Sequence, residues 1–145
     1  MATTAKWVFE KAMHLMDEAS EATGAADTAD TAGYKHRTLP ILNLLRLECW
    51  PASDTFGAAE PGKRPVCPEI TGFDSPIGLD DTLCQSVLPY GLAAHLLLDE
   101  NPAAAAFFQQ RYQELLGWAR RTLPAVSEDI ADVYGGVEHG RYGRW

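Results

Sequence analysis

Apolar residues recur with helical spacing in four segments of the chain. The first, residues 4–21, places them on one face and most of its charges on the other, and Thr3 or Thr4 is a suitable N-cap. The second segment, "TLPILNLLRLECWP", predicts a helix that begins near Pro40, because proline is tolerated at the first helical position. The Trp-Pro pair ends this helix, since the residue before a proline is pushed out of helical geometry.

The third segment, "LDDTLCQSVLPYGLAAHLLLDE", is apolar almost all round, which is typical of a buried central helix. Asp80 or Asp81 would cap its start. Pro89 removes one of its hydrogen bonds and predicts a tilt. Gly91 and its small neighbours leave a shallow surface that another helix can approach closely.

The fourth segment has the clearest boundary, with Asn101 as N-cap and Pro102 at the first helical position. The link from the third helix is short, so the two helices are expected to form an antiparallel hairpin. The helix should end at Leu123-Pro124. Its expected buried face comprises Phe107, Phe108, Tyr112, Leu115, Leu116 and Ala119.

These elements predict an all-α fold class: a small bundle of about four helices in a single domain over residues 1–145. Residues 23–33 lack large apolar side chains and are expected to form a loop. Residues 51–78 contain five prolines and four glycines, which exclude a long helix, although "PVCPEITGF" would allow one short extended edge segment. A long irregular segment is usually functional or disordered, so 51–78 is either an arm that lies on a neighbouring subunit or a disordered loop.

Residues 125–145 lose helical periodicity after about Val133 and place aromatic and arginine side chains in a glycine-rich context. Such a tail is expected to dock on the protein's own core or on a partner. The arm and this docking tail together supply the candidate interface residues, which are Pro65, Ile70, Phe73, Tyr134, Arg141, Tyr142, Arg144 and Trp145.

The overall composition is that of an ordinary globular protein, with 46% hydrophobic and 22% charged residues. No apolar run has the length of a membrane span, and the N-terminal residues lack the pattern of a signal peptide, so we expect a cytoplasmic location. The net charge of −8 argues against sequence-specific or general nucleic-acid binding, which needs a basic surface.

Residue types that carry chemistry are present but scattered. Cys49, Cys67 and Cys84 are odd in number and widely spaced, which favours free, buried or half-buried thiols over a disulfide framework or a zinc site. The four histidines include no i/i+4 pair, and no phosphate-binding or dinucleotide-binding loop is found. We therefore predict no enzyme activity, no catalytic residues, no metal site and no cofactor.

His95 leaves two interpretations open. It would be a buried base with Asp99, four residues further on, as its partner. The alternative, which we favour, is a structural helix histidine that hydrogen-bonds Asp99, a backbone carbonyl or a neighbouring helix.

The run "LDDTLCQSVLPYGLAAHLLLDENPAAAAFFQQRYQELL", together with "SEDIADVYGGVEHGRYGRW", resembles small proteins from the structural modules of tailed phages and Firmicutes prophages. Those proteins are similar to the head–tail connector class, also called adaptor or head-completion proteins. The resemblance covers mainly the C-terminal half and extends more loosely to "TLPILNLLRLECWP". It implies a mostly helical protein that forms a ring beneath the portal and joins the DNA-filled head to the tail.

The expected function is therefore virion assembly, with the portal and other head–tail proteins as partners. The chain would be made in the bacterial cytoplasm, where it is either a monomer or already associated. It would form a homo-oligomeric ring at the head–tail junction of the virion. The alternative is a small cytoplasmic protein-binding or regulatory module without catalytic activity.

Overall fold

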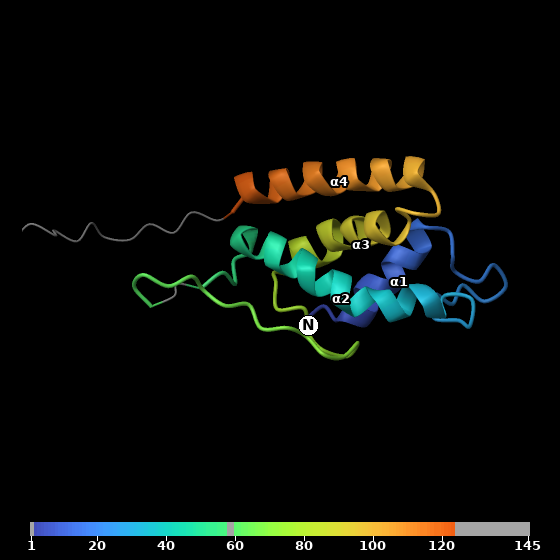
Figure 1. Ribbon diagram of the computed structural model, residues 1–145, viewed down its shortest axis with the longest axis horizontal. Coiled ribbons are helices and arrows are strands. Elements are labelled where there is room, and N and C mark those ends of the chain that lie inside the picture. Colours follow the sequence, from blue (N-terminus) through green and yellow to red (C-terminus); the bar gives the residue numbers. More distant parts are fainter. Residues whose placement is uncertain (1, 58–59, 124–145) are drawn as a thin grey trace, which may run out of the picture.

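The computed structural model describes residues 2–57 and 60–123, which form four α-helices and no strands (Figure 1). The predicted all-α fold is confirmed. The elements are α1 (Ala5–Leu15), α2 (Ala32–Cys49), the 3-10 helix η1 (Trp50–Ala52), the π-helix η2 (Leu83–Val87), α3 (Leu88–Leu96) and α4 (Pro102–Arg121). Helix α3 is the centre of this arrangement, because it packs against α1, α2 and α4.

Helix α1 begins as predicted and ends earlier than predicted. The Thr4 side chain accepts a hydrogen bond from the Trp7 N–H, which makes Thr4 the N-cap. The helix ends at Leu15 because Asp17 adopts a left-handed conformation, with φ of 59°. The Glu18 N–H then donates to the Met13 carbonyl at 2.9 Å, which closes the C-terminus as in a Schellman motif.

The predicted start of the second helix at Pro40 is wrong, since α2 begins at Ala32 and carries Pro40 in its interior. Tertiary contacts stabilise the turns before the proline. The Tyr34 hydroxyl donates to the Glu100 carboxylate, and Arg37 donates to the Leu96 carbonyl at 3.4 Å. Tyr34 also lies on the buried face of α2, so packing offsets the roughly 3 kcal/mol that an interior proline costs.

The central helix is buried as predicted, and its start is capped by Asp80, whose Oδ1 accepts from the Leu83 N–H at 3.0 Å. The π-helix η2 directly precedes α3, whose second residue is Pro89. The Leu88 N–H donates to the Leu83 carbonyl, five residues back, instead of the usual four. The hydrogen-bond pattern is therefore shifted next to the proline, which has no N–H of its own.

Helix α4 returns along α3 in the opposite direction and forms one edge of the molecule (Figure 1). Asn101 caps it as predicted, accepting from the Ala104 N–H at 3.2 Å, and Pro102 is its first residue. The predicted buried face is wrong at one position, because Phe107 is 60% exposed. Since Phe107 and Phe108 are adjacent, only one of them can face α3, and Phe108 does.

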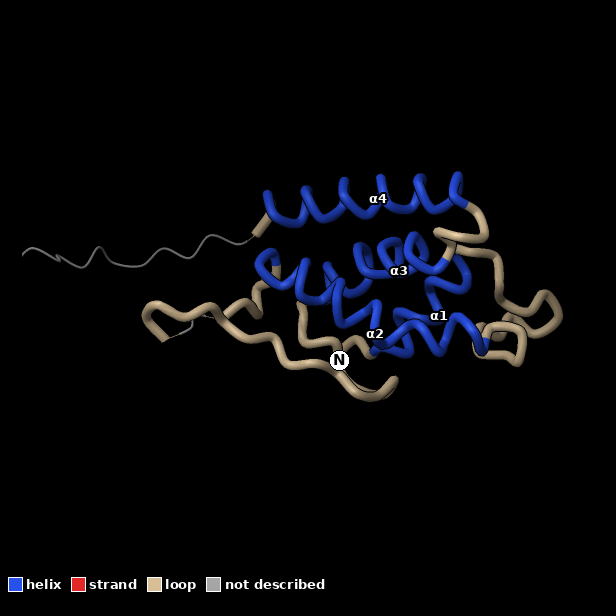
Figure 2. The backbone as a smooth tube through the Cα atoms, in the orientation of Figure 1, coloured by secondary structure: helices blue, strands red, loops and turns tan. Residues whose placement is uncertain are grey.

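Residues 53–57 and 60–79 form an irregular segment, and the short edge strand predicted within "PVCPEITGF" is not observed. The nearest pairing is an isolated bridge between Thr4 and Pro76. The loop after η1 projects from the left-hand end of the molecule, and a second loop joins α1 to α2 at the other end, over residues 16–31 (Figure 2). The predicted loop at 23–33 falls mainly within the latter.

Candidate functional site

The second half of the arm is fixed to the helical body by one buried arginine. Arg46 of α2 is 5% exposed, and its Nε donates to the Ile77 carbonyl at 2.7 Å. Its Nη1 donates to the Pro68 carbonyl at 2.7 Å and to Asn43 Oδ1 at 3.2 Å. One side chain therefore holds two points of the arm that are far apart in sequence. No pattern in the sequence indicates this role, because the Pro68 and Ile77 acceptors are backbone carbonyls.

Asn43 makes a second attachment through a reciprocal pair of hydrogen bonds with Ile70. Its Nδ2 donates to the Ile70 carbonyl, and its Oδ1 accepts from the Ile70 N–H, both at 3.0 Å. The N-terminal residues add a third attachment, because the Lys6 N–H donates to the Phe73 carbonyl at 2.8 Å. The part of the arm from residue 68 to 77 is thus packed on the body.

The candidate interface residues consequently lie in different environments. Ile70 and Phe73 are half-buried against the protein's own core, and the Phe73 ring packs edge-on against Phe9 with 6.0 Å between centroids. Pro65 lies in the projecting part of the arm, beside Val66, which is 78% exposed. The remaining five candidates, Tyr134, Arg141, Tyr142, Arg144 and Trp145, lie outside the described residues.

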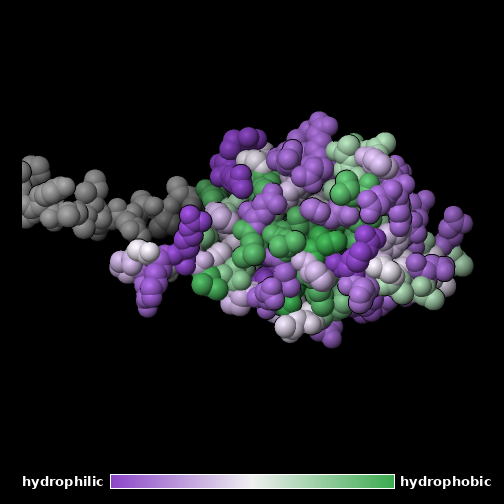
Figure 3. Space-filling view, viewed as in Figure 1, coloured by the Kyte–Doolittle hydropathy of each residue, from purple (hydrophilic) through white to green (hydrophobic). Residues whose placement is uncertain are grey.

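Large apolar side chains are exposed on several elements, and most of them could not be recognised as exposed from helical spacing alone. A band of hydrophobic residues crosses the middle of the face shown in Figure 3. Helix α2 exposes two leucines and α4 exposes two aromatic residues. The exposed large apolar residues are Leu44, Leu47, Phe56, Val66, Leu98, Phe107, Trp118 and Leu123.

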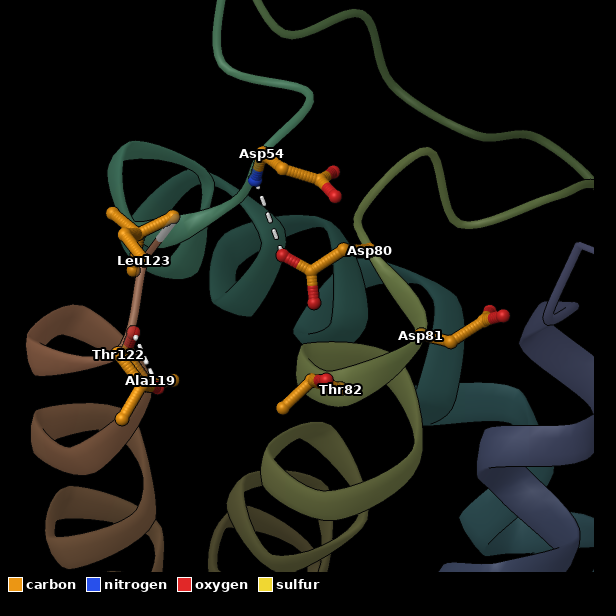
Figure 4. Close-up of a pocket in the computed structure, with 8 residues that line it drawn as sticks. Asp54, Asp80, Asp81, Thr82, Ala119, Thr122 and Leu123 are labelled. Atoms are coloured by element: carbon orange, nitrogen blue, oxygen red, sulfur yellow. Dashed lines mark hydrogen bonds between the residues drawn. The ribbon is translucent and has the colours of Figure 1, made fainter. Parts of the chain in front are cut away.

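A depression of about 280 Å³ lies between the C-terminus of α4 and the residues that precede η2 (Figure 4). Three acidic residues, Asp54, Asp80 and Asp81, contribute to its lining. Asp80 is engaged at both oxygens, since Oδ1 caps the helix and Oδ2 accepts from the Asp54 N–H at 3.1 Å. Asp81 accepts from the Thr3 hydroxyl at 2.8 Å, and its carboxylate points away from the α4 side (Figure 4). Two of the three acids therefore serve the local fold.

The two buried thiols are poorly suited to nucleophilic chemistry. Cys49 Sγ lies 3.3 Å from the Tyr112 hydroxyl, and burial raises the pKa of Cys49 to about 11. Burial likewise raises the pKa of Cys84 to about 12. Because the thiolate is the reactive form, both sulfurs are held in the unreactive state near neutral pH. The prediction of free, buried or half-buried thiols is confirmed, with Cys67 the half-buried one.

His95 is exposed, which contradicts the interpretation as a buried base. It lines a shallow, mainly apolar depression between α3 and α4 with residues that include Leu98, Pro102 and Gln109. The His95 side chain makes no hydrogen bond to Asp99 or to any other residue in the described part of the chain, so the predicted structural bond is not found either.

Within residues 2–57 and 60–123, no three His, Cys, Asp or Glu side chains come together in a way that would hold a metal ion. None of the described helices is both long enough and apolar enough to cross a membrane. A scan against protein-family models, a search of curated proteins and a search of solved structures each found no match to this chain. The resemblance to head–tail connectors therefore stays a prediction.

Proposed function

We propose that this protein is a structural assembly protein of a phage or prophage particle, a head–tail connector that packs in a ring against the portal. The observation that carries the proposal is the exposure of large apolar side chains on separate elements, including Leu44 and Leu47 on α2 and Val66 on the arm. Exposed apolar residues on several surfaces suit a subunit that meets different neighbours on different sides.

The anchoring of the arm also supports an assembly role. Arg46 and Asn43 hold its second half on the body, which leaves residues 60–66 as a projection with a fixed base. In a ring, each subunit meets the next through two different surfaces, so a projection of this kind has an acceptor on the neighbouring copy. The subunit would be made in the bacterial cytoplasm and would end at the head–tail junction of the virion.

A small cytoplasmic protein-binding or regulatory module is the second candidate. The same exposed residues favour it, because one partner protein could cover them without any ring. The carboxylate of Asp80 and the thiols of Cys49 and Cys84 have structural roles, which favours either binding function over catalysis.

Light scattering across a concentration series tests the proposal, with and without a portal protein co-expressed from the same genome. A connector should shift in mass when the portal is added, and Val66→Asp should abolish the shift. Ala22→Asp is the control, since it places the same charge on an exposed apolar residue of the α1–α2 loop, outside the set of exposed large apolar side chains. Deleting residues 125–145 should prevent assembly while the helical circular dichroism signal is retained. A mass that ignores the portal would favour the binding module.

A further inference from the structure

Helix α4 carries a second amphipathic pattern on the side that does not face α3. Its buried face packs on α3, η1 and η2. On its outer flank, half-buried or exposed residues recur with alternating steps of three and four, which is the spacing of a coiled-coil seam. We call this set the α4 stripe; it consists of Ala104, Phe107, Arg111, Glu114, Trp118 and Arg121.

The exposure of the α4 stripe is unusual for its residue types. Phe107 is 60% exposed and Trp118 is 54% exposed, although both are residues that folding and binding normally bury. Between them lies an ion pair, with 3.3 Å from Arg111 Nη1 to Glu114 Oε2 and side chains that are 45% and 51% exposed. The stripe thus has a charged centre with one large aromatic residue on either side of it.

The α4 stripe is complementary to itself when it is reversed. Phe107 and Trp118 are equally distant from the midpoint between residues 112 and 113, and so are Arg111 and Glu114. An antiparallel second copy of α4 with its two-fold axis at this midpoint would place each Phe107 opposite the other copy's Trp118. It would also place each Arg111 opposite the other copy's Glu114. Ala104 would face the other copy's Arg121, a small residue opposite a long aliphatic stem.

We propose that two copies of this chain associate through the α4 stripe as an antiparallel, two-fold symmetric dimer. Charge complementarity selects a second copy as the occupant, because the same symmetry pairs both the aromatic residues and the opposite charges. In a two-fold interface every contact occurs twice, because residue i of the first copy contacts residue j of the second and residue j of the first contacts residue i of the second. The pairs within the stripe satisfy this condition. The charged centre fixes the register, as a polar layer does within an apolar coiled-coil seam.

This dimer goes beyond the proposed connector function and does not depend on it. A ring is built from two different surfaces, whereas the α4 stripe pairs with itself, so the dimer is a state of the free chain. The portal experiment uses Val66 on the arm, while the experiment below uses α4 alone. If one proposal fails, the experiment on the other still gives its own result, so the two failures can be told apart.

The test is a pair of single charge reversals in the full chain, studied by sedimentation equilibrium. Arg111→Glu would place two acids opposite two acids across the dimer axis, and Glu114→Arg would do the same with arginines. Each variant alone should therefore show a two-fold lower mass than the wild type. An equimolar mixture of the two should return to the dimer mass, because acids then face arginines at both positions.

Both variants also lose the ion pair between Arg111 and Glu114 within the helix, and mixing cannot restore that pair. Recovery of the dimer mass on mixing would therefore show that the charges act across the interface. The matched controls are Lys6→Glu and Glu10→Lys, which break an exposed pair on α1 with the same changes of charge and should remain dimers. If a charge reversal prevents folding, Trp118→Ala provides a second measurement. It should weaken dimerisation about ten-fold or more while circular dichroism shows the helices intact.

A wild-type chain that is monomeric from micromolar to millimolar concentration would overturn the proposal. So would single variants that stay dimeric, or a mixture that does not recover the dimer mass. A larger oligomer that is insensitive to both charge reversals would assign self-association to another surface and would also overturn it.

Discussion

The ring of Tyr112 occupies the space beside Gly91 into which a side chain at that position would project. A Cβ at residue 91 would lie 2.8 Å from Tyr112 Cδ2 and 3.2 Å from Leu45 Cδ1. The hydroxyl of the same tyrosine lies 3.3 Å from Cys49 Sγ on α2. One side chain of α4 therefore crosses the central helix α3 and reaches α2, and this arrangement needs glycine at position 91.

Gly91→Ala should lower the free energy of unfolding by about 1 kcal/mol. Overpacking costs about 1–3 kcal/mol, and it opposes the gain of about 1 kcal/mol that alanine brings to a helix. Urea unfolding of the two proteins measures the difference. Gly117→Ala in α4 is the matched control, because its Cβ would meet nothing closer than 3.8 Å and it should raise the stability. Equal gains for both variants would contradict the close contact.

Removal of the Arg46 guanidinium should release the arm. Arg46→Met leaves the Pro68 and Ile77 carbonyls without their donor, and we expect a loss of about 2 kcal/mol or more. Hydrogen exchange should increase locally over residues 68–77, since these backbone positions lose their anchor.

Two further variants test whether the geometry of Arg46 matters or its charge alone. Arg46→Lys should also be less stable than the wild type, because one ammonium group cannot reproduce the planar set of guanidinium donors. Lys6→Met removes an exposed cation from α1 and should change the stability little. If Arg46→Lys matched the wild type, a charge alone would be sufficient to hold the arm.

Caps could be predicted from the sequence because they depend on local geometry. Thr4, Asp80 and Asn101 each accept a hydrogen bond from a backbone N–H three residues further on. That relationship is contained within four residues of sequence, so no knowledge of the remaining fold is required.

Features that depend on distant contacts could not be predicted. The part of α2 before Pro40 is held by Tyr34 and its bond to Glu100, a residue in the turn between α3 and α4. The exposure of Phe107 depends on the rotation of α4 against α3, which helical spacing alone left undecided between adjacent phenylalanines. The same limit applies to the candidate interface residues. Phe73 was expected at an interface because it is an aromatic residue of the arm, but its ring packs against Phe9 in the core of the same chain.

Loss of the Asp80 carboxylate should destabilise the start of the central helix. Asp80→Ala removes the bonds to the Leu83 and Asp54 N–H groups, and we expect a loss of about 1 kcal/mol, as for other N-caps. Asp80→Asn keeps an acceptor oxygen and should retain most of the stability. Thermal unfolding distinguishes the two variants, and equal losses would show that the negative charge, and not the cap, is what stabilises this helix end.

Stability should fall at alkaline pH because burial keeps the core thiols neutral. The pKa of Cys84 is raised from 9.0 to about 12 in the folded protein. Above pH 9.0 the unfolded chain loses the proton while the folded chain retains it, so the unfolded state becomes favoured as pH rises. The stability that Cys84 contributes is fully present below pH 9.0, its pKa in the unfolded chain. It is lost as the pH rises from 9.0 to about 12, at about 1.4 kcal/mol per pH unit.

Cys84→Ala should therefore make the alkaline decline in the free energy of unfolding less steep than in the wild type. Denaturant unfolding at a series of pH values above 9.0 measures the slope. Val87→Ala is the control, because it removes buried volume from the same π-helix without removing a titratable group. It should lower the stability at every pH and keep the wild-type slope, since the buried thiol still resists deprotonation. Parallel slopes for the wild type and Cys84→Ala would show that Cys84 releases its proton as readily in the folded chain as in the unfolded one.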